Sequence, residues 1–248
     1  LCPVTLELGG KNPNIIMSDA DLDIAIPGVI DGMRYTRQGQ ACTAGSRVYI
    51  HEKIYDKVLE GAVEKLSKLK MGNALDEKSD IGAIISEEQL KRTLYYMDIA
   101  KKNSSTKILH GGNQSKGGEY KDGFYYQPTL LSGLPVSSLV CQEEVFGPVA
   151  CAIPFKSFDE VMKSANDTQF GLSAVLWTKD LSRALQFVDE IEAGFVQVNQ
   201  CVAPRANVSY GGIKMSGLGK EYAFDSMMNH FTQSKTVLIN RGKSNIDN

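Results

Sequence analysis

A chain of 248 residues, 42% of them hydrophobic, can bury a core large enough for one sizeable domain or for one domain with an appendage. Its 27 basic and 29 acidic residues give a net charge of -2 and are spread along the chain, which argues against a nucleic-acid or other polyanionic partner. No apolar run approaches the roughly 20 residues that a membrane-spanning helix needs, so no membrane partner is expected.

The five cysteines are widely spaced, odd in number and without a Cys-x-x-Cys pair. This pattern predicts neither a disulfide framework nor a zinc site, and it favours a reducing compartment. The first residue, Leu1, is not Met, and residues 4–8 already have the pattern of a strand. We therefore expect an absent upstream part. A cytoplasmic location is predicted, and a mitochondrial one stays open because a leader would be lost with that part.

Strand-type segments open the chain. Residues 4–8 and 14–17 read as strands separated by two glycines. Ser18, with Asp21 three residues later, has the pattern of a helix N-terminal cap, and apolar residues then recur with helical spacing at Ile26, Val29, Ile30 and Met33. Pro27 lies within this stretch and should either kink the helix or mark its start.

Segments with helical and strand patterns alternate through the rest of the chain. Helices are predicted over 53–70, from about Glu87, over 158–165, over 181–191 and from about Lys220. Strands are predicted at 47–51, 174–177, 195–198 and, before a polar tail, 231–240. A glycine-rich surface loop is predicted at 111–118. This alternation indicates an α/β fold with an open, largely parallel sheet and flanking helices.

Two local patterns imitate ligand sites but lack residues that such sites need. Asp19, Asp21 and Asp23 have the spacing that opens a calcium loop, yet isoleucines stand at its sixth and twelfth positions. Gly217-Leu218-Gly219 lacks the third glycine and the preceding buried strand of a dinucleotide fingerprint. No metal site is predicted, and no glycine-rich phosphate loop is predicted within this chain.

Cys42 is the candidate nucleophile. It lies between a predicted helix end and a predicted strand, and the small residues after it leave room for a substrate carbon to approach the sulfur and for backbone N–H groups to face an oxyanion. The alternative is a small buried hydrophobic side chain, which is the commoner role of a single cysteine.

Glu7 is the candidate base. It ends an apolar strand, where partial burial would raise the carboxyl pKa and suit it to take a proton from water. The alternative is a salt bridge at the strand end with a lysine such as Lys11.

The segment Glu143-Glu144-Val145-Phe146-Gly147-Pro148 is a candidate cofactor contact, in which one acid would bind a ribose diol and the ring would pack on a nicotinamide. The alternative is a solvated acidic turn with Phe146 in the core.

Three segments occur together in the order found in one family. The chain resembles the aldehyde dehydrogenase superfamily through Leu6-Glu7-Leu8-Gly9-Gly10-Lys11, then Gly39-Gln40-Ala41-Cys42-Thr43-Ala44-Gly45-Ser46-Arg47, then Glu143-Glu144-Val145-Phe146-Gly147-Pro148. The likeness covers nearly all of residues 4–240. The resemblance implies the C-terminal half of an NAD(P)-dependent aldehyde dehydrogenase, with residues 1–10 ending the cofactor-binding domain, 11–219 forming the catalytic domain, and 220–248 forming a C-terminal helix, an oligomerisation strand and a tail.

Carried over residue by residue, the resemblance makes Cys42 the nucleophile and Glu7 the general base. It also implies that Glu144 and Phe146 contact the nicotinamide ribose and ring, and that Leu8 touches the nicotinamide through its backbone. The implied reaction is oxidation of an aldehyde to a carboxylic acid through a Cys42 thioester that water, activated by Glu7, hydrolyses.

The resemblance also implies one further cofactor contact and the lining of the substrate pocket. Gln89 resembles the family's contact to the adenosine ribose. Ala41 and Thr43 flank Cys42 in the implied substrate pocket. Tyr210 stands where the family usually has Phe and is expected to line the same pocket. Gln197 also departs from the family pattern, so the resemblance does not identify the aldehyde.

The resemblance implies several partners. The cofactor is NAD or NADP, since the residue that distinguishes them belongs to the absent upstream half, as does an Asn that completes the oxyanion hole. A homo-oligomer, dimer or tetramer, is expected, with residues 231–240 added as a strand to a neighbouring subunit. The alternatives are a coenzyme A-acylating relative, disfavoured because Glu7 is retained, and a non-catalytic half-chain or structural relative.

Overall fold

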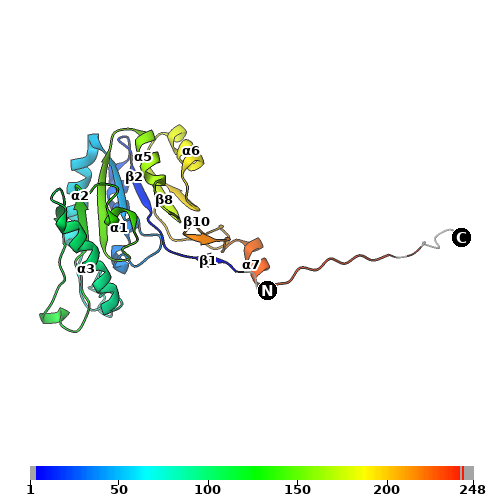
Figure 1. The fold of residues 1–248 in the computed structure, drawn as a ribbon, viewed down its shortest axis with the longest axis horizontal. Coiled ribbons are helices and arrows are strands. Elements are labelled where there is room, and N and C mark those ends of the chain that lie inside the picture. Colours follow the sequence, from blue (N-terminus) through cyan, green and yellow to red (C-terminus); the bar gives the residue numbers. More distant parts are fainter. Residues whose placement is uncertain (1–3, 241, 243–248) are drawn as a thin grey trace.

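A seven-stranded sheet runs through the centre of the molecule in the computed structural model, which describes residues 4–240 and residue 242 (Figure 1). Its strands lie in the order β4-β5-β6-β3-β2-β8-β9. Their bounds are Lys107–His110 (β4), Thr129–Ser132 (β5), Val149–Phe155 (β6), Arg47–His51 (β3), Pro13–Ile16 (β2), Ser173–Trp177 (β8) and Phe195–Val198 (β9). Every neighbouring pair is parallel except β4 and β5, which confirms the predicted sheet.

Helices cover both faces of this sheet. One face packs against α1 (Leu22–Met33) and α2 (Tyr55–Lys68). The other packs against α3 (Glu87–Lys102), α4 (Leu139–Gln142), α5 (Phe158–Asn166) and α6 (Leu181–Glu190). Because successive strand residues point to opposite faces, Ile15 belongs to the second layer and Ile16 to the first. Both faces are therefore buried, as parallel sheets require.

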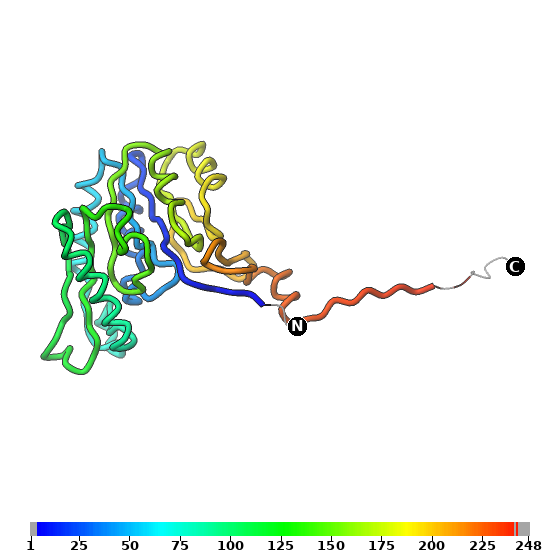
Figure 2. The backbone as a smooth tube through the Cα atoms, viewed as in Figure 1, coloured from blue at the N-terminus to red at the C-terminus, as the bar shows by residue number. Residues whose placement is uncertain are grey.

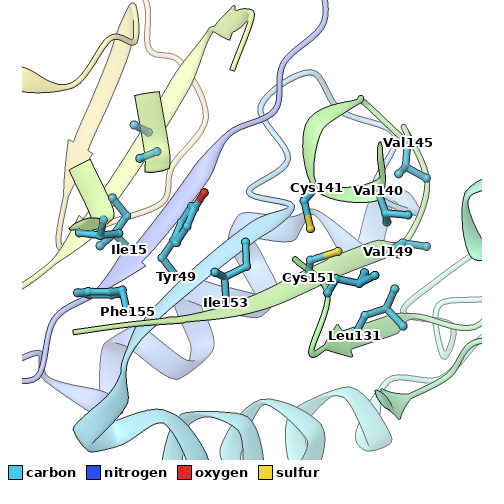
Figure 3. Close-up of a cluster of buried hydrophobic side chains, with 14 of the residues drawn as sticks. Ile15, Tyr49, Leu131, Val140, Cys141, Val145, Val149, Cys151, Ile153 and Phe155 are labelled. Atoms are coloured by element: carbon cyan, nitrogen blue, oxygen red, sulfur yellow. The ribbon is translucent and has the colours of Figure 1, made fainter. Parts of the chain in front are cut away.

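The layer under α3 to α6 forms a continuous apolar core, part of which is drawn in Figure 3. There the sulfurs of Cys141, from α4, and Cys151, from β6, lie near one another among aliphatic side chains. Both thiols are free and fully buried. Cys201 is a half-buried free thiol on the other side of the sheet, and Cys2 lies outside the described residues.

Side-chain caps define where the helices begin. Ser18 is not the cap of α1: Asp21, the extended residue directly before the first helical turn, accepts a hydrogen bond from the Asp23 N–H at 3.1 Å. Pro27 lies inside α1 and does not mark its start.

The predicted helix over 53–70 is a 3-10 turn followed by α2. The 3-10 turns are Tyr35–Arg37, Glu52–Ile54 and Gly118–Tyr120.

Two small antiparallel sheets stand beside the main one. The strand predicted at 4–8 is shorter, β1 (Leu6–Glu7), and pairs with β11 (Gly217–Leu218). It is exposed and contributes nothing to the core. The second sheet pairs β7 (Phe170–Gly171) with β10 (Ile213–Lys214). The pairing of β1 with β11 brings residues 6–7 against the segment around 210–220.

The C-terminal region departs from the sequence prediction. The last helix, α7, spans Phe224–Phe231 and begins after the predicted Lys220. Residues 232–240 form no strand, so the predicted strand at 231–240 is wrong for the chain by itself. Figures 1 and 2 show this segment running away from the body of the molecule. A strand needs hydrogen-bonding neighbours, and the segment has none beside it within the described chain.

Candidate active site

Cys42 lies in a loop between the 3-10 turn Tyr35–Arg37 and the amino end of β3. The buried side chain of Asn12 fixes this loop, because its amide nitrogen donates to the carbonyl oxygens of Cys42, at 2.8 Å, and Ala44, at 2.9 Å. The amide oxygen of Asn12 accepts from the Ser173 N–H at 2.9 Å. The nucleophile loop is thereby tied to β8. Cys42 itself is half-buried, as are its neighbours Ala41 and Thr43.

Two glycines allow the opening segment to approach this loop closely. A Cβ on Gly10 would lie 2.6 Å from the Cys42 carbonyl oxygen, and a Cβ on Gly9 would lie 2.4 Å from a carboxylate oxygen of Glu144. Real Cβ atoms do not come so near to other heavy atoms. Gly9 and Gly10 therefore lie between the nucleophile loop and the Glu144 loop and bring the two within one site.

The Tyr210 side chain reaches the nucleophile from far along the chain. Its hydroxyl oxygen lies 3.6 Å from the Cys42 sulfur. The residue is 6% exposed, and burial raises the pKa of Tyr210 above the ordinary tyrosine range, with further contributions from Cys42, Glu7 and Tyr222. Its hydroxyl therefore stays protonated over the range in which enzymes usually work.

Glu7 lies next to Tyr210. A Cβ on Gly211, the residue after Tyr210, would be 3.1 Å from a Glu7 carboxylate oxygen. Although the Glu7 side chain is exposed, loss of hydration to nearby protein atoms raises its pKa, the charge of Glu221 raises it further, and Lys220 lowers it. Within the described part of the chain Glu7 forms no ion pair, so the alternative of a salt bridge with Lys11 is wrong. Lys11 is 1% exposed, with its side chain inside the protein.

The Glu144 carboxylate is held against the opening segment. One oxygen accepts from the Gly10 N–H at 3.0 Å. Burial raises the pKa of Glu144, and that hydrogen bond together with Arg92 and Lys11 lowers it. The Glu144 carbonyl oxygen accepts from Arg92 at 2.6 Å. The alternative of a freely solvated acidic turn is therefore wrong for Glu144.

Phe146 is fixed through its backbone. It adopts a left-handed conformation with φ of 55°, which costs energy in a bulky residue and needs support from its surroundings. The side-chain amide of Gln89 supplies that support by donating to the carbonyl oxygens of Val145, at 3.0 Å, and Phe146, at 2.7 Å. Gln89 thus anchors this loop. Its predicted contact to an adenosine ribose remains a prediction.

A hollow of about 550 Å³ opens beside this loop. It is lined by Ile85, Ser86, Glu88, Gln89, Arg92, Glu144 and Phe146. Three predicted cofactor residues thus share one surface depression. Another hollow of about 500 Å³, between α2 and the loop around Gly111, contains none of the predicted site residues.

Comparisons with known proteins identify the family. The model of the aldehyde dehydrogenase family matches residues 1–237. An aldehyde dehydrogenase of Rhodospirillum rubrum is 41% identical over an alignment of 245 residues, and the match covers 96% of this chain and 48% of the relative. The chain belongs to the aldehyde dehydrogenase family. It spans about half the length of the curated relatives it matches.

Solved aldehyde dehydrogenases share its fold. The NAD+ complex of the Bacillus cereus enzyme superimposes with a TM-score of 0.90 at 35% identity, covering 97% of this chain and 48% of the other. The betaine aldehyde dehydrogenase of Staphylococcus aureus in complex with NAD+ gives a TM-score of 0.87 at 34% identity, covering 91% of this chain and 44% of the other.

Within this aldehyde dehydrogenase chain, the predicted site residues form two neighbouring groups. The first group consists of Cys42, Tyr210 and Glu7. The second group consists of Glu144, Phe146 and Gln89. Leu8 lies in the chain between Glu7, of the first group, and Gly9, which adjoins Glu144 of the second. Its backbone N–H donates to the Ser216 carbonyl oxygen at 3.0 Å. Their chemical roles stay predictions.

Sequence reasoning missed two residues that shape the site. Asn12 fixes the nucleophile loop and Arg92 fixes the Glu144 backbone. Asn12 directly follows the Gly-Gly-Lys segment, so its position beside the base was a usable signal. Arg92 lies one turn after Gln89 on the same face of α3. A prediction that places Gln89 at the cofactor site therefore also indicates Arg92.

No group of three or more His, Cys, Asp or Glu side chains among residues 4–240 and 242 is arranged to hold a metal ion. No helix in that part of the chain is long and apolar enough to cross a membrane.

Proposed function

We propose that this chain supplies the nucleophile and the base for NAD(P)-dependent oxidation of an aldehyde to a carboxylic acid. The observation that carries the proposal is the grouping of Cys42, Tyr210 and Glu7 around a loop that Asn12 fixes, beside the anchored carboxylate of Glu144. A half-buried sulfur, a carboxylate with a raised pKa and a second anchored carboxylate are the groups that this chemistry needs.

Cys42 forms the covalent bond to the substrate. As its thiolate adds to the aldehyde carbon, the sulfur–carbon bond forms and the carbonyl π electrons move to the oxygen. The Cys42 N–H donates no hydrogen bond to any residue of the described chain, so it is available to bind that oxyanion. The family resemblance adds an Asn as second donor in the region that this chain does not match.

The hollow beside Glu144 and Phe146 fits the nicotinamide end of the cofactor. The Glu144 carboxylate oxygen left after the Gly10 contact is suited to accept from a ribose hydroxyl, and the Phe146 ring borders the same space. Bound there, the cofactor would accept a hydride from the substrate carbon. NAD and NADP are both compatible with these residues.

Glu7 resolves the thioester. Its carboxylate takes a proton from water, the water oxygen bonds to the acyl carbon, and the carbon–sulfur bond breaks to return the Cys42 thiolate and release the acid. Because burial raises the pKa of Glu7, its carboxylate is a better proton acceptor than an ordinary glutamate. This role favours hydrolysis over the coenzyme A-acylating alternative.

The test uses an activated ester, because ester cleavage needs the sulfur and the base but no hydride acceptor. With p-nitrophenyl acetate, the chain should release one nitrophenolate per molecule in a burst, followed by slower turnover. Cys42→Ala should abolish the burst, and Cys201→Ala, which removes another half-buried thiol, should leave it unchanged. Release that survives Cys42→Ala would disprove the nucleophile assignment.

Oxidation itself is tested in a chimera. The chain is joined to the part of the Rhodospirillum rubrum relative that it does not match, and a panel of aldehydes is assayed by the absorbance of reduced nicotinamide with NAD and with NADP. Oxidation that requires Cys42 supports the proposal. A chimera that binds cofactor but oxidises none of the panel favours the non-catalytic alternative.

A further inference from the structure

The contact between Tyr210 and Cys42 differs from what the family resemblance implies, since phenylalanine is usual at this position. The hydroxyl oxygen and the sulfur are 3.6 Å apart, a hydrogen-bonding distance for sulfur because its radius is larger than that of oxygen. A phenylalanine would fill the same space with no group able to bind the sulfur. The tyrosine therefore adds a polar contact at the reacting atom.

The Tyr210 ring is held in place before any substrate arrives. Its backbone exchanges hydrogen bonds with Glu221, at 3.0 and 2.7 Å. Its ring packs edge-on against Phe195, with centroids 5.4 Å apart, and against Tyr222, at 5.7 Å. Because two rings and the paired backbone hold Tyr210 in place, its hydroxyl contacts the sulfur with little loss of side-chain entropy.

We propose that the Tyr210 hydroxyl donates a hydrogen bond to the Cys42 thiolate and holds the sulfur charged and oriented for attack. The inference rests on the proposed role of Cys42 as nucleophile and adds a catalytic residue that touches the reacting atom. The direction of the bond follows from chemistry, since a phenol is a stronger donor than a thiol and a thiolate is only an acceptor.

The groups around the pair favour this direction. Burial, Cys42, Glu7 and Tyr222 all raise the pKa of Tyr210, so the phenol keeps its proton where a thiolate forms. Glu7 faces Tyr210. The charge of Glu221 raises the pKa of Glu7, and the charge of Lys220 lowers it.

The test compares Tyr210→Phe with the parent chain by the rate at which iodoacetamide alkylates Cys42, because alkylation depends on the thiolate and needs neither cofactor nor substrate. At about pH 7 the variant should react about tenfold more slowly, the factor expected for a modest hydrogen bond to a charged group. At about pH 10, where a free thiol ionises unaided, the two rates should converge.

Tyr95→Phe is the matched control, since it removes the phenol of an exposed tyrosine on α3 and should leave the profile unchanged. A Tyr210→Phe rate that equals the parent rate at every pH would overturn the inference while leaving Cys42 as nucleophile. A loss that is equal at every pH would also overturn it, since that pattern means altered access to the sulfur. Absence of Cys42-dependent ester cleavage in the parent chain would instead remove the proposed function itself.

Discussion

The surroundings of each sulfur determine how readily it reacts. Cys141 and Cys151 are fully buried in the core, and Cys201 is half-buried, with burial as the main cause of its raised pKa. Cys42 sits in a half-buried loop within reach of a hydroxyl donor. A protein interior excludes alkylating reagents, and burial disfavours the thiolate of Cys201.

Among the described cysteines, we expect Cys42 to be alkylated first. Brief treatment of the folded chain with iodoacetamide at neutral pH, followed by peptide mass spectrometry, should find label on Cys42 before Cys141, Cys151 or Cys201. Denaturant should expose all of them, which serves as the control. Labelling of Cys201 at the rate of Cys42 would contradict the assignment.

The charges beside Glu7 predict a paired shift in pH dependence. Deacylation requires the carboxylate, so its rate should fall as the pH drops through the raised pKa of Glu7. Lys220 lowers this pKa, so Lys220→Met should move the fall to higher pH; Glu221 raises it, so Glu221→Gln should move the fall to lower pH. Steady turnover of p-nitrophenyl acetate against pH measures both shifts. Shifts in the same direction would refute Glu7 as the base.

At the scale of elements, the nucleophile loop depends on the side chain of Asn12, the residue directly before β2. The Asn12 amide nitrogen donates to the carbonyl oxygens of Cys42 and Ala44 and so holds two points of the loop. Asn12→Ala should therefore lower the free energy of unfolding by about 1–3 kcal/mol and slow acylation of Cys42. Urea unfolding measures the first effect and the ester burst the second.

Asn73→Ala is the control for that change, since Asn73 is exposed and its side chain only accepts from the Leu75 N–H. It should alter stability by less than about 0.5 kcal/mol. Equal effects of the two substitutions would mean that the Asn12 bonds are not what fixes the loop.

The sequence patterns predicted the long helices and the strands at 47–51, 174–177 and 195–198, but missed β4, β5 and β6. The starts of α3, α5 and α6 match the sequence prediction, because a capped amphipathic helix repeats its pattern over several turns. β5 is only four residues long, and β6 contains Pro154, which argues against a strand when the sequence is considered alone. Short motifs located Cys42, Glu7 and Glu144, but no local pattern predicts that Tyr210 lies beside Cys42.

At the scale of the whole molecule, the C-terminal segment leaves apolar side chains uncovered. Val237, Leu238 and Ile239 are 62%, 91% and 79% exposed. An uncovered apolar run with strand propensity is prone to pair with another chain. We propose, in line with the family resemblance, that residues 231–240 add as a strand to a second copy.

Deletion of residues 232–248 should reduce the oligomer to a smaller species in sedimentation velocity. Val237→Lys with Ile239→Lys should do the same without shortening the chain, because charge on the segment opposes its burial. Ester cleavage by Cys42 reports whether each variant is still folded. An unchanged sedimentation coefficient in both variants would exclude this role.

The cofactor-binding capacity of the chain follows from which part of NAD(P) its residues can reach. The hollow beside Glu144 and Phe146 suits the nicotinamide end, but a pyrophosphate needs a glycine-rich turn or a helix N-terminus beside a strand. None of the turns among the described residues has that glycine-rich form. The chain by itself should therefore bind NAD and NADP more weakly than micromolar in calorimetric titration and oxidise no aldehyde. Loss of a single oxyanion donor alone lowers rates by about a hundred- to a thousandfold.

The chimera with the Rhodospirillum rubrum relative should bind cofactor tightly, and Glu144→Gln in that chimera should weaken binding by removing the carboxylate that faces the ribose. A micromolar dissociation constant for the chain by itself would show that these residues hold the whole cofactor site.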